Sequence, residues 1–275
     1  MISPPKIPEP PLYIESETAL KQLFRDLKKA PSIALDTEAA SFHKYKDRIY
    51  LLQLSTPAIT AVIDPLAVTD LSALGKLLVD PDVEVVFHDA DYDLRLLDRD
   101  YGFRVSNIFD TRIAAQLLNE PGVGLGALLE KYVGVKPDKR FQRADWSARP
   151  LTEAMLHYAA TDTMHLLDVR DILREQLRGR NRLSWAQEEF RSLESIRWTR
   201  PAADPDRFWR LKGAKALRGR SLAVLRELHE WRERVAKRAD RAPFRIMNNE
   251  ALIILAREQP RTMEALKKIR GVGSE

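Results

Sequence analysis

The stretch Ile33-Ala34-Leu35-Asp36-Thr37-Glu38 starts as an apolar strand and ends in two acids separated by one residue. Alternate residues of a strand point to the same face of a sheet, so Asp36 and Glu38 lie side by side. Their charges raise each other's pKa in a half-buried strand, and a divalent cation would relieve that cost. Carboxylate oxygens suit Mg²⁺ or Mn²⁺. An exposed strand end is the alternative explanation, and the pair alone does not exclude it.

Three strand-like runs follow one another in this region, and helices alternate with strands after them. The second and third runs are separated by a short turn at residues 56–58, which predicts a hairpin. This order predicts an α/β domain with a mixed sheet flanked by helices. The expected strands are 32–39, 49–55, 59–63 and 83–87, and residues 107–110 are expected as a short strand or a loop. The expected helices are 16–30, 70–79, 92–100, 111–119, 124–133 and one long helix from Thr152 to about Leu177.

A second acidic segment follows the strand expected at residues 83–87. Asp89 and Asp91 are explained as residues that cap the next helix and complement its dipole. Asp93 precedes Leu94 and belongs to the first turn of that helix, from which it could face the sheet edge that carries Asp36. Asp93 is therefore the candidate functional acid of this segment.

A third element lies on the helix that begins at Thr152. Tyr158 and Asp162 are four residues apart and share one helix face beside small alanines, where they could approach a phosphate closely. A tyrosine packed on the core and a solvated aspartate would explain this pair if it stood alone. Its combination with the two other acidic segments favours a functional site.

The order of these motifs resembles the DEDD superfamily of 3′→5′ exonucleases in its Tyr-containing branch, most closely ribonuclease D. Asp-x-Glu stands on a first strand, an Asp follows a later strand, and Tyr-x3-Asp stands on a helix. The resemblance implies a ribonuclease H-like fold and covers roughly residues 15–175. Further matching segments are residues 51–55, 109–111 and 145–151.

The resemblance implies hydrolysis of phosphodiester bonds with two divalent metal ions, Mg²⁺ or Mn²⁺. Asp36 would bridge both ions. Glu38 and Asp162 would hold the ion that activates water, and Asp93 would support the second ion. Tyr158 would orient the attacking water. Two cations roughly 3.5–4 Å apart stabilise the attacking and leaving oxygens of an in-line displacement, and they also balance the charge of four carboxylates.

Three residues near these acids are candidate substrate-binding residues, namely Phe42, Gln53 and His88. Phe42 would stack on the 3′-terminal base, an interaction worth ~1–3 kcal/mol that does not depend on base identity. A core aromatic explains Phe42 equally well. The five histidines have no metal-like spacing with one another, so a structural role also explains His88.

Charge divides the chain into two parts. Residues 1–169 carry 19 Lys+Arg and 25 Asp+Glu, a net charge of −6, whereas residues 170–275 carry 26 and 15, a net charge of +11. A basic C-terminal part favours binding to a polyanion, although a solvated arginine-rich surface is the simpler alternative. The helical C-terminal part is similar to the HRDC domain, a nucleic-acid-binding module, through Arg234, Arg241, Pro243, Phe244 and Ile246 and the later Leu252, Ala256, Pro260 and Leu266.

The expected organisation has four segments. Residues 1–15 form an extended arm, 16–180 the exonuclease domain, 181–205 a linker with one helical piece, and 206–275 an HRDC-like helical domain. Residues 271–275 follow a helix closely, which suggests a turn into a further helix, and a natural end of the chain is the alternative.

The composition limits the class of protein. There are no cysteines, which excludes disulfides and fits a cytoplasmic protein, and no apolar run approaches the ~20 residues that cross a bilayer. The Pro-rich start does not have the pattern of a signal peptide.

We expect a monomeric 3′→5′ exoribonuclease that trims the 3′ ends of tRNA precursors or other structured RNA. The alternatives are a 3′→5′ DNA exonuclease and a nucleic-acid-binding adaptor without catalysis.

Overall fold

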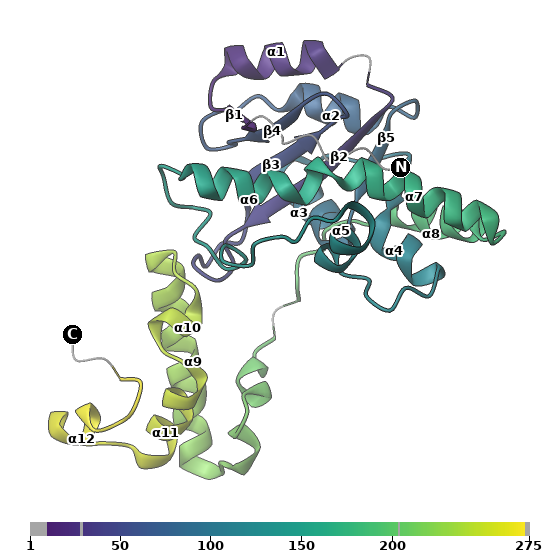
Figure 1. Cartoon of the computed structure of the whole chain (residues 1–275). Helices are drawn as coiled ribbons and strands as arrows, with labels where there is room; N and C mark the ends of the chain where they lie inside the picture. Colours follow the sequence, from purple (N-terminus) through teal and green to yellow (C-terminus); the bar gives the residue numbers. More distant parts are fainter. Residues whose placement is uncertain (1–9, 28–29, 203, 273–275) are drawn as a thin grey trace. The chain divides into compact units, whose positions relative to one another are not determined.

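The computed structural model describes residues 10–27, 30–202 and 204–272. Its contacts divide the chain into two compact units. The first unit contains residues Met1–Ala40 and Arg48–Thr199, and the second contains Ser41–Asp47 and Arg200–Glu275. Both units are drawn in Figure 1. None of the helices in the described ranges is long and apolar enough to cross a membrane.

The first unit is built on a six-stranded mixed sheet with the order β1-β4-β3-β2-β5-β6. β2 pairs with β3 and β3 with β4 in antiparallel fashion, which confirms the predicted hairpin. The β1–β4, β2–β5 and β5–β6 pairs are parallel. The strands are β1 (Leu12–Ile14), β2 (Ser32–Ala39), β3 (Ile49–Ser55), β4 (Thr60–Ile63), β5 (Glu84–Phe87) and β6 (Ile108–Asp110).

Alternation along β2 gives the sheet two different faces. Ile33 and Leu35 point into a large apolar cluster that includes residues of the three helices α1, α2 and α3. Ala34, Asp36 and Glu38 point to the opposite face, because side chains of a strand alternate. The helices of the first cluster are α1 (Glu17–Leu27), α2 (Ser72–Leu78) and α3 (Asp91–Tyr101).

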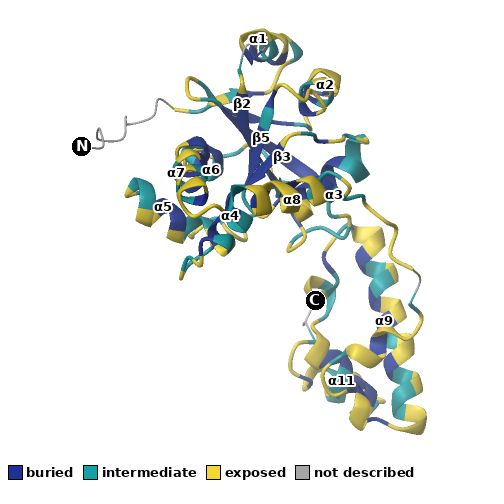
Figure 2. Ribbon diagram, turned by 90° about the vertical axis from the view of Figure 1, so that its right-hand side faces the viewer, coloured by how far each residue is buried: buried dark blue, intermediate teal, exposed yellow. Residues whose placement is uncertain are grey.

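The face that carries the acids is covered by α6, α7 and their neighbours. Figure 2 shows the buried strands lying between the two layers of helices. Ser55 on β3 forms a hydrogen bond of 2.7 Å with Thr163 on α6, and Arg170 on α7 pairs with Glu84 on β5. These helices are α4 (Thr111–Leu117), α5 (Leu125–Val133), α6 (Glu153–Met164), α7 (Leu166–Gly179) and α8 (Leu183–Leu193).

The long helix predicted from Thr152 to about Leu177 is two helices. Thr152 caps α6 as expected, since its hydroxyl accepts a hydrogen bond from the Met155 amide. The prediction of one continuous helix was wrong because the backbone leaves helical geometry at His165 (φ −109°, ψ 4°), which ends α6 and precedes α7. Apolar periodicity continues across the break, so the sequence pattern does not reveal it.

Two segments outside the expected exonuclease boundaries belong to the first unit. Leu12–Ile14, expected in the extended arm, forms an edge strand that pairs with β4; residues 1–9 of that arm lie outside the described residues. The expected linker 181–205 contains α8, whose Phe190 packs against Phe109 with ring centroids 4.7 Å apart. Apolar burial therefore extends the first unit to Thr199.

The second unit is helical, as predicted. Its longest helix, α9, buries one side in a small apolar cluster formed with residues such as Phe208, Leu217 and Leu252. Segment Ser41–Asp47, expected in the exonuclease domain, folds with this unit. The elements are the short 3₁₀ turns η1 (Arg207–Arg210) and η2 (Ala214–Ala216) and the helices α9 (Gly219–Ala239), α10 (Pro243–Ile246), α11 (Asn249–Glu258) and α12 (Met263–Lys267).

The loop before α6 is tied to the sheet by Arg149. Its guanidinium pairs with the buried Asp64 at the end of β4 and donates to the carbonyl oxygens of Tyr50 and Trp146. The Tyr13 hydroxyl also donates to Asp64, at 2.6 Å. Burial acts to raise the Asp64 pKa, but the hydrogen bonds from Arg149 and Tyr13 outweigh it and hold the pKa below its usual value.

We predict that Arg149→Met destabilises the protein by about 3 kcal/mol, because it leaves the buried Asp64 carboxylate without its cation. Chemical denaturation at neutral pH measures this loss. The double variant Arg149→Met/Asp64→Asn should recover part of the stability, since it removes the uncompensated charge. A loss below roughly 1 kcal/mol for the single variant, the value of an exposed ion pair, would contradict the role given to Arg149.

Candidate active site

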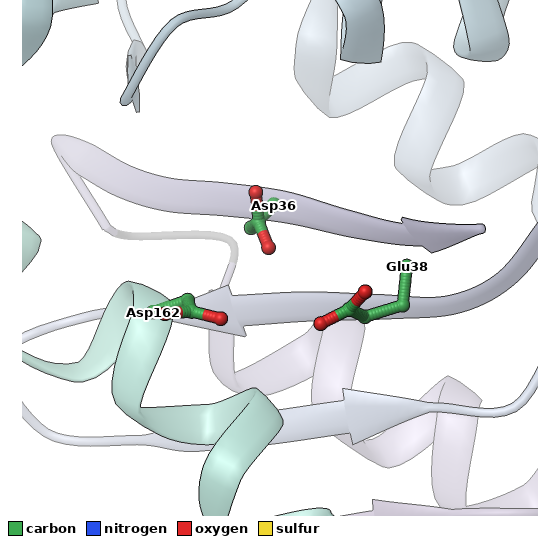
Figure 3. A group of neighbouring side chains, drawn as sticks. All are labelled: Asp36, Glu38 and Asp162. Carbon is green, nitrogen blue, oxygen red and sulfur yellow. The ribbon is translucent and has the colours of Figure 1, made fainter. Parts of the chain in front are cut away.

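Two carboxylates of β2 and one of α6 converge on the same face of the sheet. One carboxylate oxygen each from Asp36, Glu38 and Asp162 lie within 4.8 Å of one another. Figure 3 shows Asp162 reaching from its helix toward the two acids of the strand. The acids of the strand pair Asp36 and Glu38 therefore lie next to Asp162 of the helix pair, because α6 packs across β2 and β3. A β-bulge between Glu38 and Ala39 ends the regular pairing just beyond the site.

Asp93 approaches the group from α3, which packs on the opposite face of the sheet. Its buried carboxylate accepts a hydrogen bond of 2.5 Å from the Thr37 hydroxyl, between the two acids of β2. The other acids of its segment point elsewhere: Asp89 pairs with Arg112 and Asp91 with Arg95. Asp93 is thus the acid of this segment that lies beside Asp36, although it does not belong to the close group of three.

Tyr158 stands one helical turn before Asp162 and is held between two aromatic rings. Trp146 stacks on it with centroids 5.9 Å apart, and Phe141 meets it edge-on at 5.7 Å. Trp146 is itself buried and comes from the loop that Arg149 anchors. Burial, followed by the charges of the nearby acids, raises the pKa of Tyr158. Its hydroxyl therefore keeps its proton at neutral pH and can act as a hydrogen-bond donor.

The acids are costly to ionise where they lie. Burial and the Asp162 charge raise the pKa of Asp36 to about 8, and burial raises that of Asp162 to about 7. Burial and the three neighbouring acids raise the pKa of Glu38 well above its usual value, and burial and Asp36 do the same for Asp93. The four carboxylates therefore need added positive charge to be ionised together near neutral pH.

This donor set fits hard divalent cations. All the ligands offered are carboxylate oxygens, which Mg²⁺ and Mn²⁺ prefer. The three close oxygens leave room for an ion between them, and a cation there would offset the burial and mutual repulsion that raise the pKa of Asp36. Asp36, Glu38 and Asp162 would hold the cation that they share.

Thr37 and Asp110 position these acids, a role that the sequence analysis did not assign to either residue, although Asp110 lies in the matching segment 109–111. Thr37 holds Asp93, and its place between two acids on a strand was the only available signal. Asp110 caps α4 and also accepts a hydrogen bond of 2.8 Å from the Ala90 amide at the start of α3. An Asp before a helix signals a cap, but the link to a second helix is visible only in three dimensions.

The three candidate substrate-binding residues have different surroundings. Gln53 is fully buried, so the prediction that it contacts substrate does not fit the structure. His88 forms a hydrogen bond of 2.9 Å with Thr111, and burial together with Arg112 lowers its pKa to about 4, so it is neutral. Phe42 is 43% exposed and meets Phe244 edge-on within the second unit. Base stacking by Phe42 stays a prediction.

Comparison with known proteins agrees with this geometry. Residues 11–178 match the family model described as 3′-5′ exonuclease, and residues 221–275 match the HRDC domain. Ribonuclease D of Escherichia coli is 34% identical over 264 residues, which cover 95% of this chain and 70% of that protein. The chain spans about two thirds of the length of several other bacterial ribonuclease D proteins.

Solved structures show the same architecture. The catalytic core of RRP6 from Trypanosoma brucei has a TM-score of 0.88 and 31% identity, over 96% of this chain and 76% of that one. The structure of Escherichia coli RNase D, described as an exoribonuclease involved in structured RNA processing, has a TM-score of 0.71 and 33% identity over 96% and 71%. Brucella melitensis NrnC with bound Mg²⁺ has a TM-score of 0.56 and 27% identity over 62% and 85%.

The fold and the site thus define a 3′→5′ exonuclease domain with a ribonuclease H-like sheet, in a chain that also carries an HRDC domain. The chain belongs to the ribonuclease D family, and its relatives indicate a 3′→5′ exoribonuclease, as the sequence predicted. Enzymes of this class use divalent metal ions, and the group of Asp36, Glu38 and Asp162 offers carboxylate oxygens that could bind such an ion.

We predict that a divalent cation stabilises the protein more at high pH than at low pH. Folded Asp36 and Asp162 keep their protons to about pH 7–8, whereas unfolded acids lose theirs near pH 4. These groups therefore lower the stability of the metal-free protein as the pH rises from about 4 to about 8. A cation that displaces the protons restores that stability. The measurement is the melting temperature in EDTA and in Mn²⁺ at about pH 6 and 8.

Asp36→Asn provides the matched control for this measurement, because it removes a charge at nearly constant volume. The variant should gain little from Mn²⁺ at either pH and should be at least as stable as the unmutated protein in EDTA. If Mn²⁺ stabilises the unmutated protein equally at both pH values, the link between cation binding and these acids is wrong.

Proposed function

We propose that the chain removes nucleotides from the 3′ ends of structured RNA, such as tRNA precursors, by a two-metal-ion mechanism. The convergence of Asp36, Glu38 and Asp162 carries this proposal, with Tyr158 one turn away on the same helix. The Mg²⁺ seen in the related NrnC structure and the RNA named for the RNase D structure support it by similarity. Mg²⁺ or Mn²⁺ would be the metal.

Each of the four acids would have its own role toward the cations. Asp36 would contact both cations, and Glu38 and Asp162 would share the one that activates water. Asp93, held by Thr37 outside the close group, would support the second cation through water. When bound, the two cations would stabilise the attacking and leaving oxygens of the displacement.

Tyr158 would position the attacking water. Its raised pKa keeps the phenol protonated, so it would donate a hydrogen bond and would not act as the base. Trp146 and Phe141 fix its ring, which limits the directions in which the hydroxyl can point.

The proposed polarity and substrate are tested together with end-labelled oligonucleotides. The same sequence is prepared as RNA and as DNA, labelled at the 5′ end or the 3′ end, and incubated with Mg²⁺ or Mn²⁺. We expect release of the 3′ label as a mononucleotide and a ladder of shortened 5′-labelled RNA, with slower loss of DNA. Faster loss of DNA would favour the alternative of a DNA exonuclease, and RNA binding without turnover would favour the adaptor.

Tyr158→Phe removes only the hydroxyl and leaves the aromatic packing against Trp146 and Phe141. We expect kcat to fall about 10²-fold, the order of magnitude expected for a misplaced reactant, with KM for RNA and the melting temperature little changed. Single-turnover cleavage of labelled RNA at saturating Mn²⁺ separates kcat from binding. Phe141→Leu is a control that changes packing but keeps the hydroxyl, so its kcat should fall less.

The second unit would hold the RNA. Residues 200–275 carry 19 Lys+Arg and 10 Asp+Glu, a net charge of +9. A shallow groove of about 450 Å³ is lined by residues along one side of α9, and Trp231 in it is 39% exposed. Indole and guanidinium groups side by side suit a single strand, through base stacking and phosphate contacts. The groove is lined by Arg220, Ala223, Val224, Glu227, Leu228, Trp231 and Arg234.

Trp231→Ala should weaken binding of single-stranded RNA by ~1–3 kcal/mol, the value of one stacked base. Fluorescence anisotropy in the catalytically silent Asp36→Asn background measures the affinity without degradation. Trp185→Ala is the matched control, because Trp185 is an exposed tryptophan of the first unit. Equal affinities for both variants would contradict the role of the α9 groove. The monomeric state and the cytoplasmic location expected from the sequence stay predictions.

A further inference from the structure

Gln53 is a buried polar residue that the roles above leave without a function. Its side chain is 0% exposed, and neither Oε1 nor Nε2 has a hydrogen-bond partner among the described residues. Buried side-chain amides nearly always have partners, because an unpaired polar group in an apolar interior is costly. A leucine at this position would avoid the cost, so the amide requires a physical explanation.

The register of the sheet places Gln53 beside the acids. Gln53 on β3 lies directly opposite Asp36 on the neighbouring strand β2. On the other neighbouring strand, β4, the residue opposite Gln53 is Val62. Opposed residues of antiparallel strands point to the same face with Cβ atoms about 4.5–5.5 Å apart, so the Gln53 amide and the Asp36 carboxylate share one face.

Apart from the carboxylates of the site, the side chains described around Gln53 are mostly apolar. The cluster on this part of the face is apolar and includes Leu51, Val62, Ala159 and Ala160. The next polar pair along β3, Ser55 with Thr163, is satisfied by its own hydrogen bond of 2.7 Å. Among the carboxylates of the site, Asp36 is the one that the strand register places directly opposite Gln53, so it is the acceptor that we assign to the amide.

We propose that Gln53 is a positioning residue for the metal site, and this inference rests on the proposed two-metal function. When cations are bound and Asp36 is ionised, Nε2 of Gln53 donates a hydrogen bond to the Asp36 carboxylate and fixes its orientation toward the cations. A neutral donor suits this place, because it holds the carboxylate without competing as a charge with the metal. Outer partners of this kind orient the ligands of metal sites in general.

The test replaces the amide by an apolar side chain of similar length, Gln53→Met. We expect the melting temperature in EDTA to be unchanged or higher, because an unpaired buried amide is lost. Calorimetry should show Mn²⁺ affinity reduced about 10–100-fold, the effect usual for an outer partner of a metal ligand. Cleavage should need correspondingly more Mn²⁺ and recover at saturating metal. Leu54→Met, equally buried on β3 but on the opposite face, is the control and should bind Mn²⁺ normally.

A second measurement uses the unmutated protein and does not depend on how the variant folds. The side-chain amide of Gln53, labelled with ¹⁵N, should shift downfield and exchange more slowly with solvent when diamagnetic Mg²⁺ is added. Two results would contradict the proposal and leave Gln53 with only a packing role in the core. One is an amide signal that does not change on saturation with Mg²⁺. The other is an Mn²⁺ affinity of Gln53→Met equal to that of the control. Failure of the unmutated protein to bind either cation would instead refute the proposed function itself.

Discussion

The structure depends on one electrostatic constraint, the need to gather several carboxylates in a poorly solvated place. Four acids whose pKa values are all raised lie at the centre of the first unit. Separately, each acid would be more stable in water. Their convergence is an unfavourable arrangement that the rest of the fold must overcome, and whose repulsion a bound divalent cation would offset.

Apolar burial on the far face of the sheet and polar anchors on the near face provide that support. The cluster beneath α1, α2 and α3 buries Ile33 and Leu35 of β2, and strand alternation then keeps Asp36 and Glu38 on the other face. On the near face, specific polar contacts fix the helices that bring Asp162 and Tyr158. Ser55 with Thr163 holds α6, Arg170 with Glu84 holds α7, and Arg149 with Asp64 holds the loop before them. The Gln53 amide extends this set of anchors to the acids themselves.

The second unit differs in its physical character. It is small, helical and basic, and its apolar cluster is modest. Segment Ser41–Asp47, which follows the catalytic strand in sequence, is built into it: Ala242 donates to the His43 carbonyl, and Arg245 donates to the carbonyl of Phe42. The boundary between the unit that carries the acids and the basic helical unit therefore does not coincide with a single cut in the sequence.

The sequence by itself determined the local spacings and the family. Period-two alternation fixes Asp36 and Glu38 on one face, and the four-residue interval fixes Tyr158 and Asp162 on one side of a helix, because both rules depend only on backbone geometry. Asp93 was already the candidate among the three acids of the segment 89–93, and the tertiary structure supplies the physical reason, since Arg112 and Arg95 pair with the other two. Only the tertiary structure decided the break at His165 and the burial of Gln53. These features arise from contacts between residues far apart in the chain, and no local pattern encodes such contacts.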